Sequence, residues 1–244
     1  MWYNGLMDRD LVKILGFNVD TFTFDEALEY AFNNHGQIVT INPEMISAAR
    51  SNPDFANIIM NADLIVPDGI GVELGLRILG YKVRRIAGIE LGKALIVKYS
   101  KENKRIAFAG AKPGVVDKAI ENLKNEIPEL NVVYSHDGYF KNDKEILENI
   151  TSANPDLVLV ALGSPKQEFF INELKKNLPN ATMIGLGGSF DVWAGVVDRA
   201  PVIYQKLGLE WLYRTIKEPK RFKRIFPTLP LFVLKVFKER LSLK

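Results

Sequence analysis

The sequence predicts an α/β protein with a Rossmann-like, mostly parallel sheet and helices on both faces. Short runs rich in Val, Ile and Leu alternate with longer amphipathic stretches, which is the pattern of parallel sheets covered by helices. Almost every apolar run ends in a polar or glycine-rich turn. The 244 residues, 47% hydrophobic and 25% charged, are enough for one sizeable domain with an extension.

The expected elements alternate strictly and form one catalytic α/β domain at residues 1–200. Strands are expected at residues 37–42, 63–69, 104–114, 130–138, 156–165 and 181–191. Helices are expected at residues 43–62, 115–127, 144–153 and 166–178. Asp8-Arg9-Asp10 resembles an acidic metal motif, but it precedes these strands, so we interpret it as solvent-exposed.

Residues 201–244 form a different kind of segment, a basic amphipathic helical appendage. Aromatic and aliphatic residues recur there at helical spacing with Lys and Arg between them. We expect two or three short helices, broken near Pro219, Pro227 and Pro230. Residues 211–244 carry a net charge of +8, and since the whole chain carries +3, residues 1–210 carry −5.

A basic tail of this kind can meet nucleic acid, an anionic membrane or a phosphorylated ligand. The large apolar residues between its cations favour a membrane surface, and we expect no nucleic-acid binding. The N-terminus lacks the pattern of a signal peptide, and the late apolar run at residues 227–234 is too short to span a bilayer. We therefore expect a cytoplasmic protein, peripheral on the inner face of the cell membrane.

The composition and motifs also limit the kinds of site. The chain has no cysteine and two histidines, which excludes disulfides and cysteine-based zinc sites. No glycine-rich stretch matches the dinucleotide fingerprint or the P-loop. Because the strand exits offer no paired carboxylates or histidine cluster, we expect neither a metal nor another cofactor.

Asp68 is the first candidate catalytic residue. In parallel sheets, ligands bind at the carboxyl ends of the strands, and Pro67-Asp68-Gly69 follows a predicted strand. A carboxylate there is placed to take a proton from a substrate hydroxyl. Pro-Asp-Gly is also ordinary turn chemistry, and the sequence leaves both interpretations open.

Other strand exits supply further candidates. Thr40 and Asn42 lie two residues apart, so their side chains point the same way and can orient a sugar. Asn42 before Pro43 also fits a helix N-cap, and residues 164–167 fit a capping box with Ser164 as the cap and Gln167 reaching back. For both stretches a structural and a functional role stay open.

Glycine-rich exits before helices let backbone amides approach a phosphate closely. On this basis and on strand-exit position we expect the substrate-binding set to include Gly110, Lys112, Gly114, Asp137, Gly138, Gly187, Gly188 and Asp191.

An ordered set of motifs runs along nearly the whole chain: TINPE, PDGIGV, RIAGIEL, GAKPGV, HDGYF, LGSPKQE, GLGGSFDVWAG, RAP and GLEWLYRTIKEPKRFKR. Together they resemble the bacterial TagA/CpsF/WecG glycosyltransferase family, and its TagA branch most. The chain departs from the family pattern at Ile89 and Glu90, where the family often has a small polar residue and Asp.

The resemblance implies transfer of N-acetylmannosamine from UDP-ManNAc to the C4 hydroxyl of GlcNAc on undecaprenyl diphosphate, with inversion and without a required metal. This reaction builds the linkage unit of wall teichoic acid. Carried over by motif, Asp68 is the base, and Thr40, Asn42, Arg85 and Gln167 line the site. The family also has a C-terminal appendage associated with the membrane and the active site. Within this appendage we expect Arg214, Arg221 and Arg224 to bind substrate.

Two other readings stay open. The same fold and mechanism can serve another UDP sugar, such as the uronic acid of N-acetylmannosamine or glucose. A chain of this kind can also be a non-catalytic nucleotide-binding module that recruits partners to the membrane. The sequence leaves open whether the chain forms a homo-oligomer.

Overall fold

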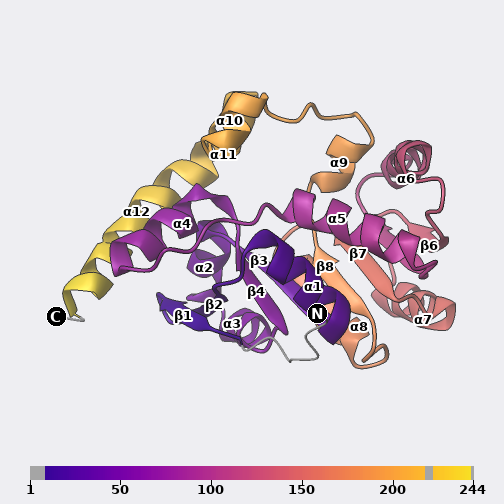
Figure 1. Ribbon diagram of the computed structural model, residues 1–244, viewed down its shortest axis with the longest axis horizontal. Coiled ribbons are helices and arrows are strands. Elements are labelled where there is room, and N and C mark those ends of the chain that lie inside the picture. Colours follow the sequence, from indigo (N-terminus) through magenta and orange to yellow (C-terminus); the bar gives the residue numbers. More distant parts are fainter. Residues whose placement is uncertain (1–8, 218–221, 243–244) are drawn as a thin grey trace, which may run out of the picture.

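The computed structural model describes residues 9–217 and 222–242. A six-stranded parallel sheet lies between two helical layers, and a long arm of helices extends along one side (Figure 1). The strand order is β4-β3-β8-β7-β5-β6, and every neighbouring pair is parallel. The strands are β3 (Gly36–Ile41), β4 (Leu64–Pro67), β5 (Ile106–Gly110), β6 (Val132–His136), β7 (Leu157–Ala161) and β8 (Thr182–Gly185). The predicted α/β fold class and its parallel sheet are confirmed.

Helices cover both faces of the sheet. Successive strand residues point to opposite sides, so the apolar residues of each strand contribute to a core on each face. In β5, Phe108 packs into one apolar core and Ala107 into another. The first face is covered by α1 (Phe24–Asn34), α5 (Gly88–Lys101), α6 (Val115–Glu126) and α9 (Ser189–Trp193). The second face is covered by α2 (Pro43–Ala49), α3 (Pro53–Met60), α4 (Gly69–Leu79), α7 (Asp143–Ala153) and α8 (Lys166–Lys175).

The alternation of strand and helix is not strict. Two helices, α2 and α3, follow β3, and two more, α4 and α5, follow β4. The predicted helical stretch at residues 43–62 is divided near Asn52, which caps α3 through its side chain. The connection after β4 therefore places α4 on one face of the sheet and α5 on the other.

A small antiparallel hairpin, β1 (Leu11–Ile14) and β2 (Phe17–Asp20), precedes the sheet. The Asp20 side chain is fully buried and accepts two hydrogen bonds from Arg9, at 2.6 and 2.8 Å. It also accepts one from the backbone N–H of Ile65 in β4 at 2.8 Å. Asp10 is exposed, as expected, whereas Arg9 is only partly exposed because its guanidinium pairs with this buried carboxylate. Asp8 lies outside the described residues.

The C-terminal arm consists of α10 (Val202–Lys206), α11 (Glu210–Lys217) and α12 (Phe222–Ser242). The expected breaks at Pro227 and Pro230 are wrong, since α12 continues through both; Pro219 lies outside the described residues. Each proline removes one backbone donor. We attribute the continuity of the helix to burial of Phe232 and Val236 in the core that α4 and α2 share with the hairpin.

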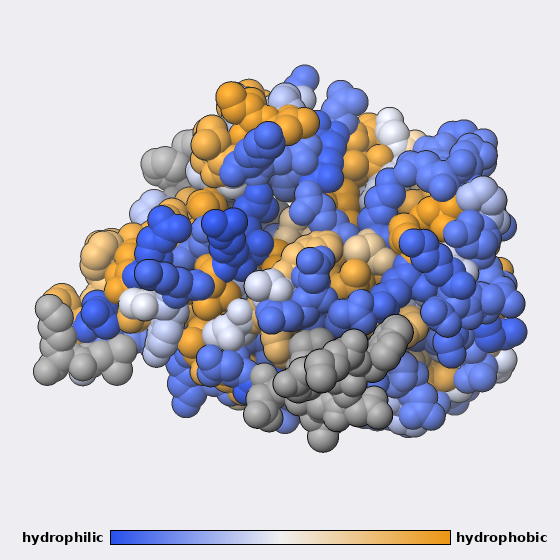
Figure 2. All heavy atoms as spheres, viewed as in Figure 1, coloured by the Kyte–Doolittle hydropathy of each residue, from blue (hydrophilic) through white to orange (hydrophobic). Residues whose placement is uncertain are grey.

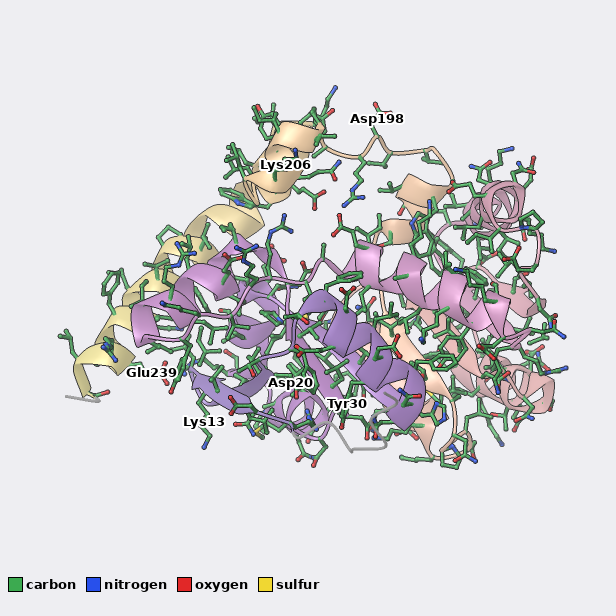
Figure 3. The ribbon with its side chains drawn as sticks, in the orientation of Figure 1. Lys13, Asp20, Tyr30, Asp198, Lys206 and Glu239 are labelled. Atoms are coloured by element: carbon green, nitrogen blue, oxygen red, sulfur yellow. The ribbon has the colours of Figure 1, made fainter. Side chains whose placement is uncertain are left out.

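The far end of α12 is fixed to the hairpin. Both carboxylate oxygens of Glu239 accept from the backbone N–H of Leu15, at 2.9 and 3.1 Å. Arg240 donates to the carbonyl of Leu79 at the end of α4 at 2.9 Å. Figure 3 marks Glu239 at the end of the arm and Lys206 at its beginning. Within the described residues, no helix is long and apolar enough to cross a membrane.

Candidate active site

A crevice is expected where neighbouring parallel strands send their chains to opposite faces of the sheet. β3 and β8 are neighbours, and they lead into α2 on the second face and α9 on the first. A cavity of about 280 Å³ opens at this place. It is lined by Thr40, Asn42, Pro43, Glu44, Asp68, Gly69, Ile70, Gly71, Arg85, Ala87, Gly88, Ile89, Leu186, Ser189, Gly208, Glu210, Trp211, Thr228 and Leu229.

Four of the five predicted catalytic residues, Thr40, Asn42, Asp68 and Arg85, meet in this cavity. Asp68 directly follows β4 and precedes the first residue of α4. Its side chain makes no capping hydrogen bond to the helix, and Gly69 takes a left-handed conformation with φ +77°. The turn chemistry predicted for Pro-Asp-Gly is therefore present in the backbone, while α4 does not hold the carboxylate as a cap.

Asn42 has the structural role that its sequence predicts. Its side-chain oxygen accepts from the backbone N–H of Met45 at 3.0 Å and caps α2, with Pro43 at the first helical position. Thr40 packs against the start of α5, where a Cβ on Gly88 would lie 3.2 Å from the Thr40 Oγ1 and Cγ2 atoms. Gly88 thus lets α5 approach the cavity closely.

Arg85 connects the cavity to the arm. Its backbone N–H donates to the Glu73 carboxylate at 3.0 Å, and its guanidinium donates to the carbonyl of Gln205 in α10. Gly208 also lies close to the body, because a Cβ there would come within 2.8 Å of the Ile70 Cβ. The beginning of the arm therefore forms one wall of the cavity, together with Glu210 and Trp211.

Gln167 is not among the residues that line the cavity. The predicted capping box is wrong: α8 begins at Lys166 after Pro165, and no side chain caps it. Instead, the Gln167 side chain crosses the end of β8, where Gly185 leaves it room, and its Oε1 accepts from the backbone N–H of Gly187 at 3.0 Å. Gln167 thus contacts the turn at Gly187, whose neighbours Leu186 and Ser189 line the cavity, but it does not line the cavity itself.

The predicted glycine-rich residues form a second group along the same edge of the sheet. Gly110 approaches the backbone of β7 so closely that a Cβ would lie 2.4 Å from the Ala161 carbonyl oxygen. The backbone N–H of Gly138 donates to the Ala111 carbonyl at 2.8 Å, which joins the exits of β5 and β6. Gly110, Lys112, Gly114, Asp137 and Gly138 therefore lie together, outside the lining of the cavity.

Gly187, Gly188 and Asp191 follow β8, between the two groups. Leu186 and Ser189 from the same turn line the cavity, whereas these three residues do not. Arg214 and Arg224 fall within α11 and α12, but their side chains lie outside the described part of the structure, as does all of Arg221.

Several lining residues were missed by sequence reasoning: Glu44, Ser189, Glu210, Trp211 and Leu229. Glu44 ends the motif TINPE, and Glu210 and Trp211 stand in GLEWLYRTIKEPKRFKR, so the motifs contained a signal for them. In the described ranges, no group of three or more His, Cys, Asp or Glu side chains is arranged to hold a metal ion.

Comparison with known proteins gives matches to one family of glycosyl transferases and to two enzymes of the same name. The Glycosyl transferase WecG/TagA/CpsF family matches residues 12–244. A protein of Bacillus spizizenii named N-acetylglucosaminyldiphosphoundecaprenol N-acetyl-beta-D-mannosaminyltransferase is 41% identical over 218 residues, covering 88% of this chain and 84% of that protein. A protein of the same name from Bacillus subtilis is 40% identical over 208 residues, covering 85% and 81%.

Proposed function

The chain belongs to the WecG/TagA/CpsF glycosyl transferase family, and we propose that it transfers N-acetylmannosamine from UDP-ManNAc to GlcNAc-diphospho-undecaprenol. One observation carries the proposal: the cavity at the β3/β8 divergence gathers Thr40, Asn42 and Asp68 in a chain 41% identical to an enzyme named for this transfer. The reaction is a step in building the linkage unit of wall teichoic acid.

Asp68 is the proposed general base. Its carboxylate takes the proton from the C4 hydroxyl of the acceptor GlcNAc as that oxygen attacks the anomeric carbon of the donor. The new bond joins O4 to C1, the bond from C1 to the diphosphate oxygen breaks, and UDP leaves with the electron pair. Attack opposite the leaving group inverts the anomeric centre, by the logic of inverting glycosidases.

Thr40 and Asn42 are proposed to orient the reacting sugars, because they border the same cavity as Asp68. The nucleotide is proposed to extend along the sheet edge over Gly187, Gly188 and Asp191 toward the group around Gly110, Lys112, Gly114, Asp137 and Gly138. Three strand spacings separate β3 from β5, which is about 14 Å. An extended nucleotide sugar can bridge this span.

The leaving diphosphate gains negative charge in the transition state and needs donors placed in advance. Backbone amides of the glycine-rich turns and the guanidinium groups of Arg85, Arg214, Arg221 and Arg224 are the proposed donors. Arginine suits this role because its planar fork can hold two phosphate oxygens.

The arm is proposed to hold the enzyme at the inner face of the cytoplasmic membrane, where its lipid acceptor lies. Leu231, Leu234, Phe237 and Leu241 form an exposed apolar row on α12, and Val202, Ile203 and Leu207 are exposed at α10. Figure 2 shows hydrophobic residues gathered over α10 and along the arm. Apolar residues interspersed with Lys and Arg are typical of helices that lie in a membrane interface.

The test is an assay of the purified chain with a short-chain lipid diphosphate carrying GlcNAc and a panel of UDP sugars. We expect UDP release and a disaccharide product with UDP-ManNAc, and at least tenfold lower kcat/KM with UDP-GlcNAc, UDP-glucose and the UDP uronic acid. Preferred use of another donor contradicts the substrate assignment. UDP binding without turnover of any donor contradicts the catalytic role.

A further inference from the structure

A buried acid lies next to the cavity and has no part in the proposed chemistry. Glu168 stands in the first turn of α8 and is 3% exposed. Its Oε1 accepts a hydrogen bond from the Gln167 Nε2 at 2.8 Å. Among the described residues, none donates a hydrogen bond of normal geometry to its Oε2. Because burying a carboxyl group without full hydrogen bonding is costly, a packing role alone does not explain an acid at this position.

The contacts of Gln167 fix the orientation of its amide. The backbone N–H of Gly187 can only donate, so the Gln167 Oε1 must face it, at 3.0 Å. The Gln167 Nε2 then faces Glu168, whose Oε1 is an acceptor in either protonation state. A chain of hydrogen bonds therefore runs from the Glu168 carboxyl through the Gln167 amide to the Gly187 backbone.

Gly187 belongs to the turn that carries two lining residues into the cavity. Leu186 and Ser189 flank Gly187 and Gly188, and both border the cavity. The turn is held by hydrogen bonds from the Ser189 Oγ to the Leu186 carbonyl at 2.7 Å and from the Leu186 N–H to β7 at 2.8 Å. Gly187 takes a left-handed conformation with φ +50°, and its N–H has the Gln167 oxygen as its partner.

We propose that Glu168 is a positioning residue: by orienting the Gln167 amide it holds the Gly187 N–H, and so sets the place of Leu186 and Ser189 in the cavity. Glu168 does not touch the substrate and acts only through Gln167. The effect of Glu168 on turnover rests on the proposed function, whereas its effect on the backbone around Gly187 does not.

The surroundings of the carboxyl group agree with this role. Burial raises the pKa of Glu168, and the side chains of Gln167 and Ser164 oppose the rise. The backbone carbonyl of Glu168 also accepts from the buried Gln37 side chain of β3 at 3.4 Å. Glu168 is thus tied through its backbone to β3 and through its carboxyl group to the neighbouring residue of its own helix, as expected of a member of a buried polar network.

The test compares three variants with one control. Glu168→Gln keeps an acceptor oxygen at this position. Glu168→Met keeps the side-chain length but removes the acceptor oxygen. Gln167→Met removes the amide that links Glu168 to the Gly187 N–H. Glu173→Met on the same helix is the control, because Glu173 is exposed and its ion pair in the described part of the chain is with Lys176 in the next turn. Amide hydrogen exchange is measured over residues 185–193, and kcat is measured with UDP-ManNAc and the short-chain acceptor.

We expect exchange over residues 185–193 to become about tenfold faster, and kcat to fall about tenfold, in Glu168→Met and in Gln167→Met. The double variant should lose no more than either single one, because both act through one chain of contacts. Glu168→Gln should restore both readouts to near the wild-type values, and Glu173→Met should leave both unchanged.

Unchanged exchange in Glu168→Met overturns the proposal, and so do fully multiplicative losses in the double variant. If Glu168→Met does not fold, Gln167→Met and Glu168→Gln decide: normal exchange in the first, or fast exchange in the second, contradicts the proposal. If the wild type turns over no donor, the proposed function has failed, and the exchange data still decide the role of Glu168.

Discussion

The backbone N–H of Asp68 donates a hydrogen bond to the carbonyl oxygen of Ile41 at 2.8 Å. Ile41 lies between Thr40 and Asn42, so this bond places the proposed base beside the two proposed orienting residues. The strands on either side are in regular parallel register, with Thr40 opposite Val66 and Ile41 opposite Pro67. The relative positions of Thr40, Asn42 and Asp68 are therefore set by the pairing of β3 with β4, and regular elements hold such groups more precisely than loops do.

Asn42 gives the first prediction, because its capping role and its proposed substrate role can be separated. Asn42→Ser keeps a good N-cap, whereas Asn42→Ala loses about 1 kcal/mol of stability. We expect both variants to lower kcat/KM by about tenfold, since both remove the amide that we propose contacts substrate. Thermal unfolding and steady-state kinetics check this. Normal kinetics in Asn42→Ser would restrict Asn42 to capping α2.

The docking of α12 gives the second prediction. Phe232 is 3% exposed and lies against α4, where a Cβ on Gly75 would come within 3.1 Å of its ring. Phe232→Ala should weaken docking by about 3 kcal/mol or more and make the arm sensitive to limited proteolysis. Phe237→Ala is the matched control, because Phe237 is 50% exposed and its loss should leave stability nearly unchanged. Equal protease resistance of both variants would refute this account of the docking.

The positions of the six strands along the chain and the polar residues at their ends were predictable, since apolar runs followed by polar turns are local features. The order of the strands in the sheet was not predicted. The hairpin was not predictable, because its two strands are four residues long and depend on the buried pair of Arg9 and Asp20. Likewise, the prolines of α12 locally favour a break, and the contacts that oppose it lie in α4. The partner of Gln167 is twenty residues away at Gly187, so the local capping pattern was misleading.

The basic tail gives the third prediction. If Arg214, Arg221 and Arg224 hold the leaving diphosphate, single changes to Lys should lower kcat at one or more positions, because Lys lacks the planar fork. Liposome binding should persist, since the charge is kept and each cation contributes about 1 kcal/mol near an anionic surface. Kinetics with a water-soluble acceptor and vesicle sedimentation separate the two effects. Full turnover in all three variants would leave the tail with membrane binding alone.

Chelation gives the fourth prediction. If backbone amides and arginines stabilise the leaving diphosphate, EDTA should leave the initial rate within about twofold of the untreated enzyme. The measurement is UDP release before and after EDTA, followed by addition of Mg²⁺ or Mn²⁺. A loss of activity that either ion restores would show that a divalent cation takes part.

Asp68→Asn tests the central claim most directly, because it keeps the shape of the side chain and removes the base. We expect kcat with UDP-ManNAc to fall by about 10² to 10⁴, while the Kd for UDP measured by calorimetry stays within about twofold. Glu44→Gln is the matched comparison, since Glu44 is another carboxylate in the same cavity, and its loss of turnover should be much smaller. Near-normal turnover in Asp68→Asn, or a larger loss in Glu44→Gln, would contradict the assignment of Asp68 as the catalytic base.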